Sequence, residues 1–129
     1  MNKLSSCFEV SIGKRKIGTE HSPFIVAEMS GNHNQSLERA LEIIEKAKGA
    51  GADAVKFQTY TADTMTLDLK RDEFSLDGMD NPWEGKSLYD VYKEAYTPWE
   101  WHETLVKRCQ DLELLWFSSP FDDSAVDFL

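Results

Sequence analysis

The sequence has little cysteine and no long apolar segment. Cys7 and Cys109 are its only cysteines, and they lie too far apart in the chain to form the closely spaced pairs of a zinc site. Two such thiols fit a reducing cytoplasm better than a disulfide scaffold, so we expect a cytoplasmic protein. No stretch is apolar for long enough to cross a bilayer, and no apolar leader stands at the N-terminus. We therefore expect neither a membrane protein nor an exported one.

Positive charge is also scarce. The 129 residues carry 14 Lys and Arg against 23 Asp and Glu, which gives a net charge of −9 at pH 7. Nucleic acids and anionic membranes bind basic surfaces, so neither is an expected partner. A small anionic substrate remains compatible with this balance, because a few local Lys or Arg side chains outweigh the global charge within a Debye length. The hydrophobic content of 41% fits one globular domain.

The most informative stretch is residues 24–34, FIVAEMSGNHN. An apolar run ends at Glu28 and gives way to small and hydrogen-bonding residues just before a predicted helix. This profile is typical of a buried parallel strand whose C-terminal end opens into a polar site, the place where α/β folds bind ligands. Glu28 is therefore a candidate catalytic carboxylate, although the residues alone equally allow a Glu that only caps the following loop. We interpret His33 as a residue that orders this loop rather than as a metal ligand.

A helix and a second strand follow at short intervals. Ser36 is a good N-cap, and apolar residues recur at helical spacing over residues 37–47. Residues 53–60, DAVKFQTY, then form a predicted strand. Strand, helix and strand with short links predict a right-handed βαβ unit in a parallel sheet. Upstream of this unit, residues 8–12 and 15–17 predict a β-hairpin.

The second predicted strand alternates in character. Lys56 and Gln58 share one face, whereas Val55 and Phe57 share the other. An open parallel sheet is covered by helices on both faces and seldom holds Lys and Gln there, whereas in a closed barrel that face points into the lumen near the site. A Lys in this position suits a phosphate or carboxylate ligand. The alternative is an edge strand with Lys56 in water.

The remainder of the chain predicts one further unit. Residues 61–85 show little periodicity and predict a loop over the mouth of the site. Ser87 is predicted to cap a short amphipathic helix. Thr97 is predicted to cap the helix after it, whose first turn would leave His102 on the surface. Residues 114–118, LLWFS, form the third predicted strand, which leads into a polar cluster that includes Ser119.

These patterns together predict an α/β fold. A hairpin at about residues 8–18 would precede the first three βα units of a (β/α)8 TIM barrel, over about residues 23–129. Because such barrels have about 250 residues, we expect this chain to be an N-terminal portion of one. A small open α/β sheet is the rival architecture, and it leaves Lys56 and Gln58 harder to explain.

At these same residues the sequence resembles the sialic-acid synthase family, and within it the pseudaminic acid branch. The resemblance runs from about residue 17 to residue 129 through AEMSGNHNQSLERAL, KFQTYTADTMTLD, GKSLYDVYKEAYTPWEW and FSSPFDDSAVDFL. It implies a transferase of nonulosonate biosynthesis that condenses phosphoenolpyruvate with an N-acetylated amino sugar and releases phosphate. In the pseudaminic acid branch that sugar is 2,4-diacetamido-2,4,6-trideoxy-altrose. The alternatives are an N-acetylneuraminate synthase acting on N-acetylmannosamine and a truncated, non-catalytic binding protein.

The resemblance also implies roles for individual residues. Glu28 matches a catalytic carboxylate that acts in proton transfer, and Gln58 matches a sugar-contacting amide. Lys56 and Ser119 match residues that bind phosphoenolpyruvate. A divalent metal, Mn²⁺ or Mg²⁺, is expected for the full-length enzyme, with its ligands on later strands that this chain lacks. The family's second barrel half and C-terminal antifreeze-like domain are also absent, so we expect a homodimer only at full length and no activity from this portion alone.

Overall fold

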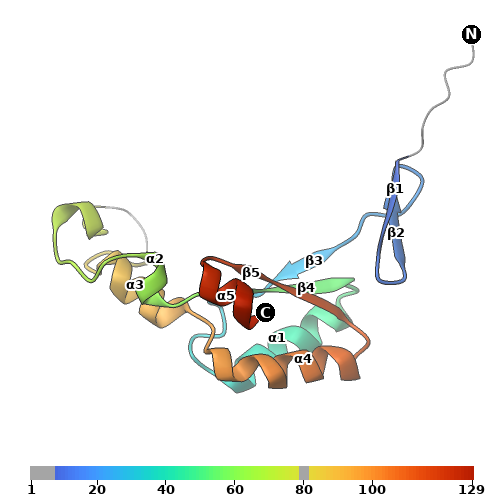
Figure 1. The fold of residues 1–129 in the computed structure, drawn as a ribbon. Coiled ribbons are helices and arrows are strands. Elements are labelled where there is room, and N and C mark those ends of the chain that lie inside the picture. Colours follow the sequence, from blue (N-terminus) through green and yellow to red (C-terminus); the bar gives the residue numbers. More distant parts are fainter. Residues whose placement is uncertain (1–7, 79–81) are drawn as a thin grey trace, which may run out of the picture.

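The computed structural model describes residues 8–78 and 82–129. An antiparallel hairpin of β1 (Glu9–Ile12) and β2 (Arg15–Gly18) precedes a parallel sheet of β3 (Val26–Glu28), β4 (Ala54–Thr59) and β5 (Leu115–Pro120). Helix α1 (Leu37–Gly49) connects β3 to β4, α4 (His102–Asp111) precedes β5, and α5 (Asp123–Phe128) follows it (Figure 1). An outer segment, residues 61–78 and 82–96, holds α2 (Ala62–Met65), the 3-10 turn η1 (Asp72–Phe74) and α3 (Leu88–Ala95); a second 3-10 turn, η2 (Trp99–Trp101), leads into α4. Within the two described ranges, no helix is both long and apolar enough to span a membrane.

The sheet has the order β3-β4-β5, with both strand pairs parallel. Helices α1 and α4 lie side by side on one face of it (Figure 1). The predicted α/β architecture, a hairpin followed by βα units in a parallel sheet, is therefore confirmed. Because β4 has a hydrogen-bonded strand on each side, the alternative of an edge strand carrying Lys56 is wrong.

The hydrophobic core lies between the sheet and these two helices. Val55 and Phe57 of β4 are fully buried in one cluster with Ile44 of α1, and Leu105 of α4 belongs to the same cluster. The opposite face of the sheet is open, and on it Val26 of β3 is 39% exposed. The prediction of a buried first strand is thus wrong for this chain. The apolar run correctly indicated a strand, but a run of this kind does not reveal whether both faces find a covering layer.

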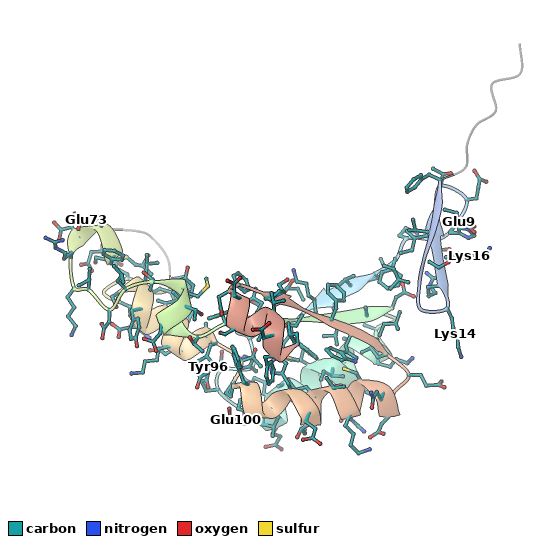
Figure 2. All side chains as sticks on the ribbon, in the orientation of Figure 1. Glu9, Lys14, Lys16, Glu73, Tyr96 and Glu100 are labelled. Atoms are coloured by element: carbon teal, nitrogen blue, oxygen red, sulfur yellow. The ribbon has the colours of Figure 1, made fainter. Side chains whose placement is uncertain are left out.

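The hairpin is attached to the sheet at the N-terminal ends of the strands. Arg15 Nε donates to Asp53 Oδ1 at 2.8 Å, just ahead of β4, and Asp53 Oδ2 accepts from the backbone N–H of Ile25 at 2.8 Å. These two bonds, the backbone one first, hold the pKa of Asp53 below its ordinary value. Figure 2 shows Glu9 and Lys16 on the hairpin itself, where their side chains pair at 2.9 Å. The hairpin is therefore attached at the end of the sheet opposite to the C-terminal strand ends.

The outer segment contains more regular structure than the irregular loop predicted for it. Helix α2 begins with a capping box at Thr61, and the hydroxyl of Tyr89 in α3 donates to Asp63 Oδ1 at 2.9 Å. The segment extends beyond the C-terminal ends of the strands (Figure 1). Figure 2 places Tyr96 where the chain passes from this segment toward α4. The part of the predicted loop at residues 79–81 lies outside the described residues.

Helix starts agree with the sequence in two cases and differ in a third. Ser36 and Ser87 cap α1 and α3 through their side chains, as predicted. Helix α4 instead follows directly after η2. The N-cap of η2 is Pro98 and that of α4 is Trp101, and neither residue makes a side-chain capping bond. The predicted cap by Thr97 is wrong, because its hydroxyl bonds to His33 on another element.

Candidate functional site at the strand ends

Glu28 and Lys56 form an ion pair across β3 and β4. They are register partners, and Lys56 Nζ lies 2.5 Å from Glu28 Oε2. Register partners in parallel strands project from the same face, so both side chains lie on the open face of the sheet. Their side chains are 30% (Lys56) and 40% (Glu28) exposed, which leaves the ammonium group within reach of a ligand from solvent.

Gln58 and Ser119 form a second register pair on that face. Gln58 lies two residues beyond Lys56 along β4, and Ser119 is its partner in β5. Ser118 points the other way, and its Oγ lies 2.6 Å from Thr59 Oγ1. The period of two along a strand thus separates the neighbouring serines between the open face and the packed face. The structure brings all four predicted site residues to one face near the strand ends: Glu28, Lys56, Gln58 and Ser119.

These four side chains have complementary chemistry. An ammonium, an amide and a hydroxyl donate hydrogen bonds that phosphate and carboxylate oxygens accept, most strongly where charge assists. The carboxylate of Glu28 is the group that can take up or release a proton. Because Glu28 already neutralises Lys56, an incoming anion competes with a carboxylate for the same ammonium group. That competition favours a ligand that carries more than one negative charge.

A buried hydrogen-bonded layer lies behind this face. His102 Nε2 is 2.9 Å from Thr59 Oγ1, which also contacts Ser118. His102 is only 5% exposed, so its predicted surface position is wrong. Burial lowers the pKa of His102, and nearby backbone carbonyls offset only part of the shift. Both hydroxyls come from residues adjacent in sequence to Gln58 and Ser119, so this layer holds the strand ends that carry the site.

His33 orders the loop after β3, as predicted. It is fully buried, and its Nδ1 accepts the backbone N–H of Gln35 at 3.2 Å. Because Nδ1 is an acceptor, Nε2 carries the proton and donates to Thr97 Oγ1 at 3.2 Å. Burial lowers the pKa of His33, which favours the neutral ring that this pair of bonds requires.

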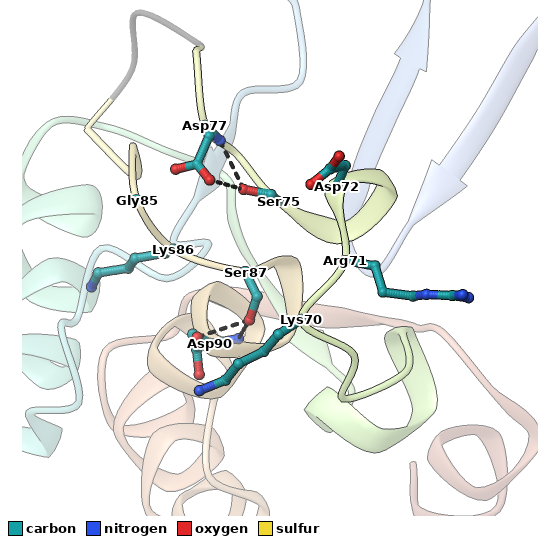
Figure 3. A pocket seen from close by; sticks show the side chains of 9 residues that line it. All are labelled: Lys70, Arg71, Asp72, Ser75, Asp77, Gly85, Lys86, Ser87 and Asp90. Carbon is teal, nitrogen blue, oxygen red and sulfur yellow. Dashed lines mark hydrogen bonds between the residues drawn. The ribbon is translucent and has the colours of Figure 1, made fainter.

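A separate hollow of about 280 Å³ lies within the outer segment (Figure 3). Lys70 extends toward Asp90, whereas Arg71 and Lys86 extend away from the hollow in opposite directions. Lys86 Nζ pairs with Glu94 at 2.6 Å. Because these cations do not converge, the hollow offers an anion a poorer set of donors than the strand ends do.

No group of three or more His, Cys, Asp or Glu side chains in residues 8–78 and 82–129 is arranged to hold a metal ion. Among the four side chains at the strand ends, Glu28 is the sole carboxylate, and it is bonded to Lys56. The residues of this portion therefore do not amount to a metal site by themselves, and their chemistry is that of donors and one proton-transfer group.

A parallel βα sheet with a carboxylate and several donors at its strand ends defines an α/β protein of the kind that binds ligands there. The model of the NeuB family matches residues 43–129, which is most of the chain. The chain belongs to the NeuB family.

Individual relatives agree with this assignment. The chain is 46% identical, over 86% of its length, to pseudaminic acid synthase of Campylobacter jejuni subsp. jejuni serotype O:2, and 47% identical, over 83%, to that of Helicobacter pylori. It spans about a third of the length of these relatives, 32% and 31%. The crystal structure of N-acetylneuraminic acid (sialic acid) synthetase from Leptospira borgpetersenii serovar Hardjo-bovis in complex with citrate matches with a TM-score of 0.75 at 29% identity. That match covers 95% of this chain and 38% of the synthetase.

Proposed function

We propose that this chain is the N-terminal portion of a synthase that joins phosphoenolpyruvate to 2,4-diacetamido-2,4,6-trideoxy-altrose and yields pseudaminic acid and phosphate. The observation that carries the proposal is the common face of two register pairs, Glu28 with Lys56 and Gln58 with Ser119. Identities of 46% and 47% to pseudaminic acid synthases, against 29% to the sialic acid synthetase, favour the altrose sugar over N-acetylmannosamine.

The proposed reaction forms a C–C bond and a C–O bond to water, and it breaks the C–O bond to phosphate. C3 of phosphoenolpyruvate attacks the aldehyde carbon of the open-chain sugar, water adds at C2, and phosphate leaves with the bridging oxygen. Lys56 and Ser119 hold the phosphate and carboxylate of phosphoenolpyruvate, and the fixed charge of Lys56 stabilises the charge that moves onto the leaving group. Gln58 orients the sugar through its amide. Glu28 serves the proton transfer that the addition of water requires.

The rest of the enzyme is part of the same proposal. A closed (β/α)8 barrel needs further βα units, which would cover the open face of the sheet. A divalent metal would polarise the aldehyde oxygen as a Lewis acid, with ligands from those later units, since the described residues form no metal site. We expect the full-length enzyme to be a cytoplasmic homodimer.

The test uses a joined enzyme, defined as this chain followed by the part of the Campylobacter jejuni relative that lies beyond the matched third. Phosphate release from phosphoenolpyruvate is measured with the altrose sugar and with N-acetylmannosamine, and the unaltered Campylobacter jejuni protein serves as the control. The proposal predicts release with the altrose sugar and at least tenfold slower release with N-acetylmannosamine. A joined enzyme that melts cooperatively but releases no phosphate with either sugar would contradict it, and a preference for N-acetylmannosamine would assign the alternative substrate.

Isotope labelling tests the proposed bond cleavage independently of sugar choice. Phosphoenolpyruvate carrying ¹⁸O in its bridging oxygen should give phosphate that retains the label, because the C–O bond breaks. Unlabelled phosphate would show P–O cleavage and would exclude the proposed chemistry.

A further inference from the structure

The loop that follows Glu28 is bonded to the C-terminal end of α3 through Gln35, a loop residue about 60 positions before that end in the sequence. Gln35 Nε2 donates to the carbonyl oxygens of Glu94 at 3.0 Å and Tyr96 at 2.6 Å. Both carbonyls belong to the C-terminal end of α3, where the last acceptors of a helix have no partner within the helix. A single amide therefore satisfies two acceptors on another element.

The same two parts of the chain also touch at Gly31 and His33. A Cβ at Gly31 would lie 2.9 Å from both the Cβ and the carbonyl oxygen of Ala95, so the backbones approach as closely as glycine permits. The buried ring of His33 bonds to Thr97 and packs edge-on against Trp101, with ring centroids 5.4 Å apart. Close packing and an amide thus hold the loop on the end of α3, and a buried imidazole holds it to the residues that follow this helix.

The loop backbone also adopts an uncommon conformation that these contacts stabilise. Ser30, Asn34 and Gln35 have φ values of 50°, 48° and 55°. Non-glycine residues adopt this left-handed region seldom, and they persist there where surrounding contacts hold them. The contacts with α3 are interactions of that kind. Without them, we expect the backbone of the loop to leave these left-handed conformations.

The outer segment is held at its other end by β4. Helix α2 begins directly after this strand, and the ring of Tyr60 lies edge-on to Tyr92 of α3 at 5.8 Å. Burial raises the pKa of Tyr60 to about 12, which matches its place between packed rings. Helix α3 is thus positioned by β4 on one side and by the loop after Glu28 on the other.

The sugar end of the proposed site lies nearer to this segment than the phosphate end. Along β4, Gln58 is two residues closer to α2 than Lys56 is, which is about 7 Å at the usual rise per residue. A displacement of α2 and α3 therefore acts more on the surroundings of Gln58 than on those of Lys56. We propose that Gln35 is a positioning residue that sets the fit of the amino sugar by fixing α3 beyond the strand ends. This inference rests on the proposed function and adds to it a residue that does not touch substrate.

Three substitutions of Gln35 in the joined enzyme separate its possible roles. Gln35→Ala removes both bonds, and Gln35→Glu keeps the length of the side chain but removes its N–H donors. Gln35→Lys restores a donor, as an ammonium group, to the carbonyl end of α3. The KM for the amino sugar should rise about three- to tenfold in the Ala and Glu variants, the size expected when one or two neutral hydrogen bonds are lost. The KM for phosphoenolpyruvate should change less than about twofold, and the Lys variant should stay close to the unsubstituted enzyme.

Hydrogen exchange supplies a second readout that does not depend on turnover. Backbone amides of residues 92–97 should exchange faster in the Ala and Glu variants, while those of β4 keep their protection. An unchanged sugar KM, equal increases in both KM values, or a Lys variant as impaired as the Ala variant would overturn the role given to Gln35. An unsubstituted joined enzyme that releases no phosphate with either sugar overturns the proposed function instead.

Discussion

Lys56 and Glu28 face each other across β4 and β3, with Nζ and Oε2 2.5 Å apart at the C-terminal end of the sheet. Both side chains are about a third exposed, and ion pairs in such positions contribute at most about 1 kcal/mol to stability. The pair is therefore weak as a stabilising device. Its position beside Gln58 and Ser119 gives it a chemical explanation instead, as a charged donor and a proton-transfer group in one site.

Replacing Glu28 by Gln in the joined enzyme should separate catalysis from binding. The amide cannot transfer the proton, so kcat should fall at least about a hundredfold. The KM for phosphoenolpyruvate should stay level or fall, because Lys56 no longer shares its charge with a carboxylate. Steady-state phosphate release measures both constants, and a normal kcat with a raised KM would contradict the assigned role.

The two serines at the end of β5 form a matched pair for substitution by Ala. Ser119→Ala should raise the KM for phosphoenolpyruvate by about tenfold and leave the melting temperature unchanged, because Ser119 lies on the open face. Ser118→Ala should lower the free energy of unfolding by about 1 kcal/mol with little effect on KM, because it loses the bond to Thr59. If the two variants showed each other's effects, the assignment of Ser119 to the open face and of Ser118 to the packed face would be contradicted.

Two glycines should respond in opposite directions to the same change. Gly31→Ala places a Cβ against the backbone of Ala95 and should destabilise the protein by about 1–3 kcal/mol. Gly49→Ala adds a Cβ that meets no atom within 4 Å at the end of α1, and it should stabilise by about 0.5–1 kcal/mol through helix propensity. Urea unfolding measures both changes, and a neutral Gly31→Ala would contradict the close seating of the loop on α3.

His33 and His102 should make the folded state less stable in mild acid. Burial lowers both pKa values from the ordinary 6.5, so the unfolded chain takes up protons at a higher pH than the folded chain. Their contribution is therefore intact above about pH 6.5 and is lost as the pH falls below it, by at most about 1.4 kcal/mol per pH unit for each ring.

Unfolding free energies between pH 7.5 and 5 measure this slope. The substitutions His33→Gln and His102→Gln should each reduce it. NMR signals assigned to His33 and His102 that titrate at the ordinary pKa of 6.5 in the folded protein would contradict the assignment of neutral buried rings.

The common face of the candidate site residues could be predicted from the sequence, because it depends on local periodicity. The alternation through Lys56 and Gln58 placed both on one face, and the parallel register then brings Glu28 and Ser119 to the same face. Strand direction and the period of two are fixed by backbone geometry, so the pattern of the sequence carries them.

What the sequence did not reveal were partners distant along the chain. Thr97 has the residue pattern of a helix cap, but its hydroxyl bonds to His33, 64 residues away. Its place in the first turn of a helix favours a surface position for His102. Its spacing of three and seven residues from the buried Leu105 and Cys109, however, indicates the inner face of that helix. Local propensity favoured the wrong answer at Thr97, whereas at His102 a usable signal was present.

Phosphate release by the joined enzyme carrying Lys56→Ala is the most direct test of the account. The matched control is Lys48→Ala. The ammonium group of Lys48 donates to the carbonyl oxygen of Glu113, at the opposite end of the sheet, just before β5 begins. Removing the fixed charge that holds phosphoenolpyruvate should lower kcat/KM at least about a hundredfold in the Lys56 variant, with a change below twofold in the control. Normal release from a folded Lys56→Ala enzyme would contradict the claim that the strand ends of this sheet form the phosphoenolpyruvate site.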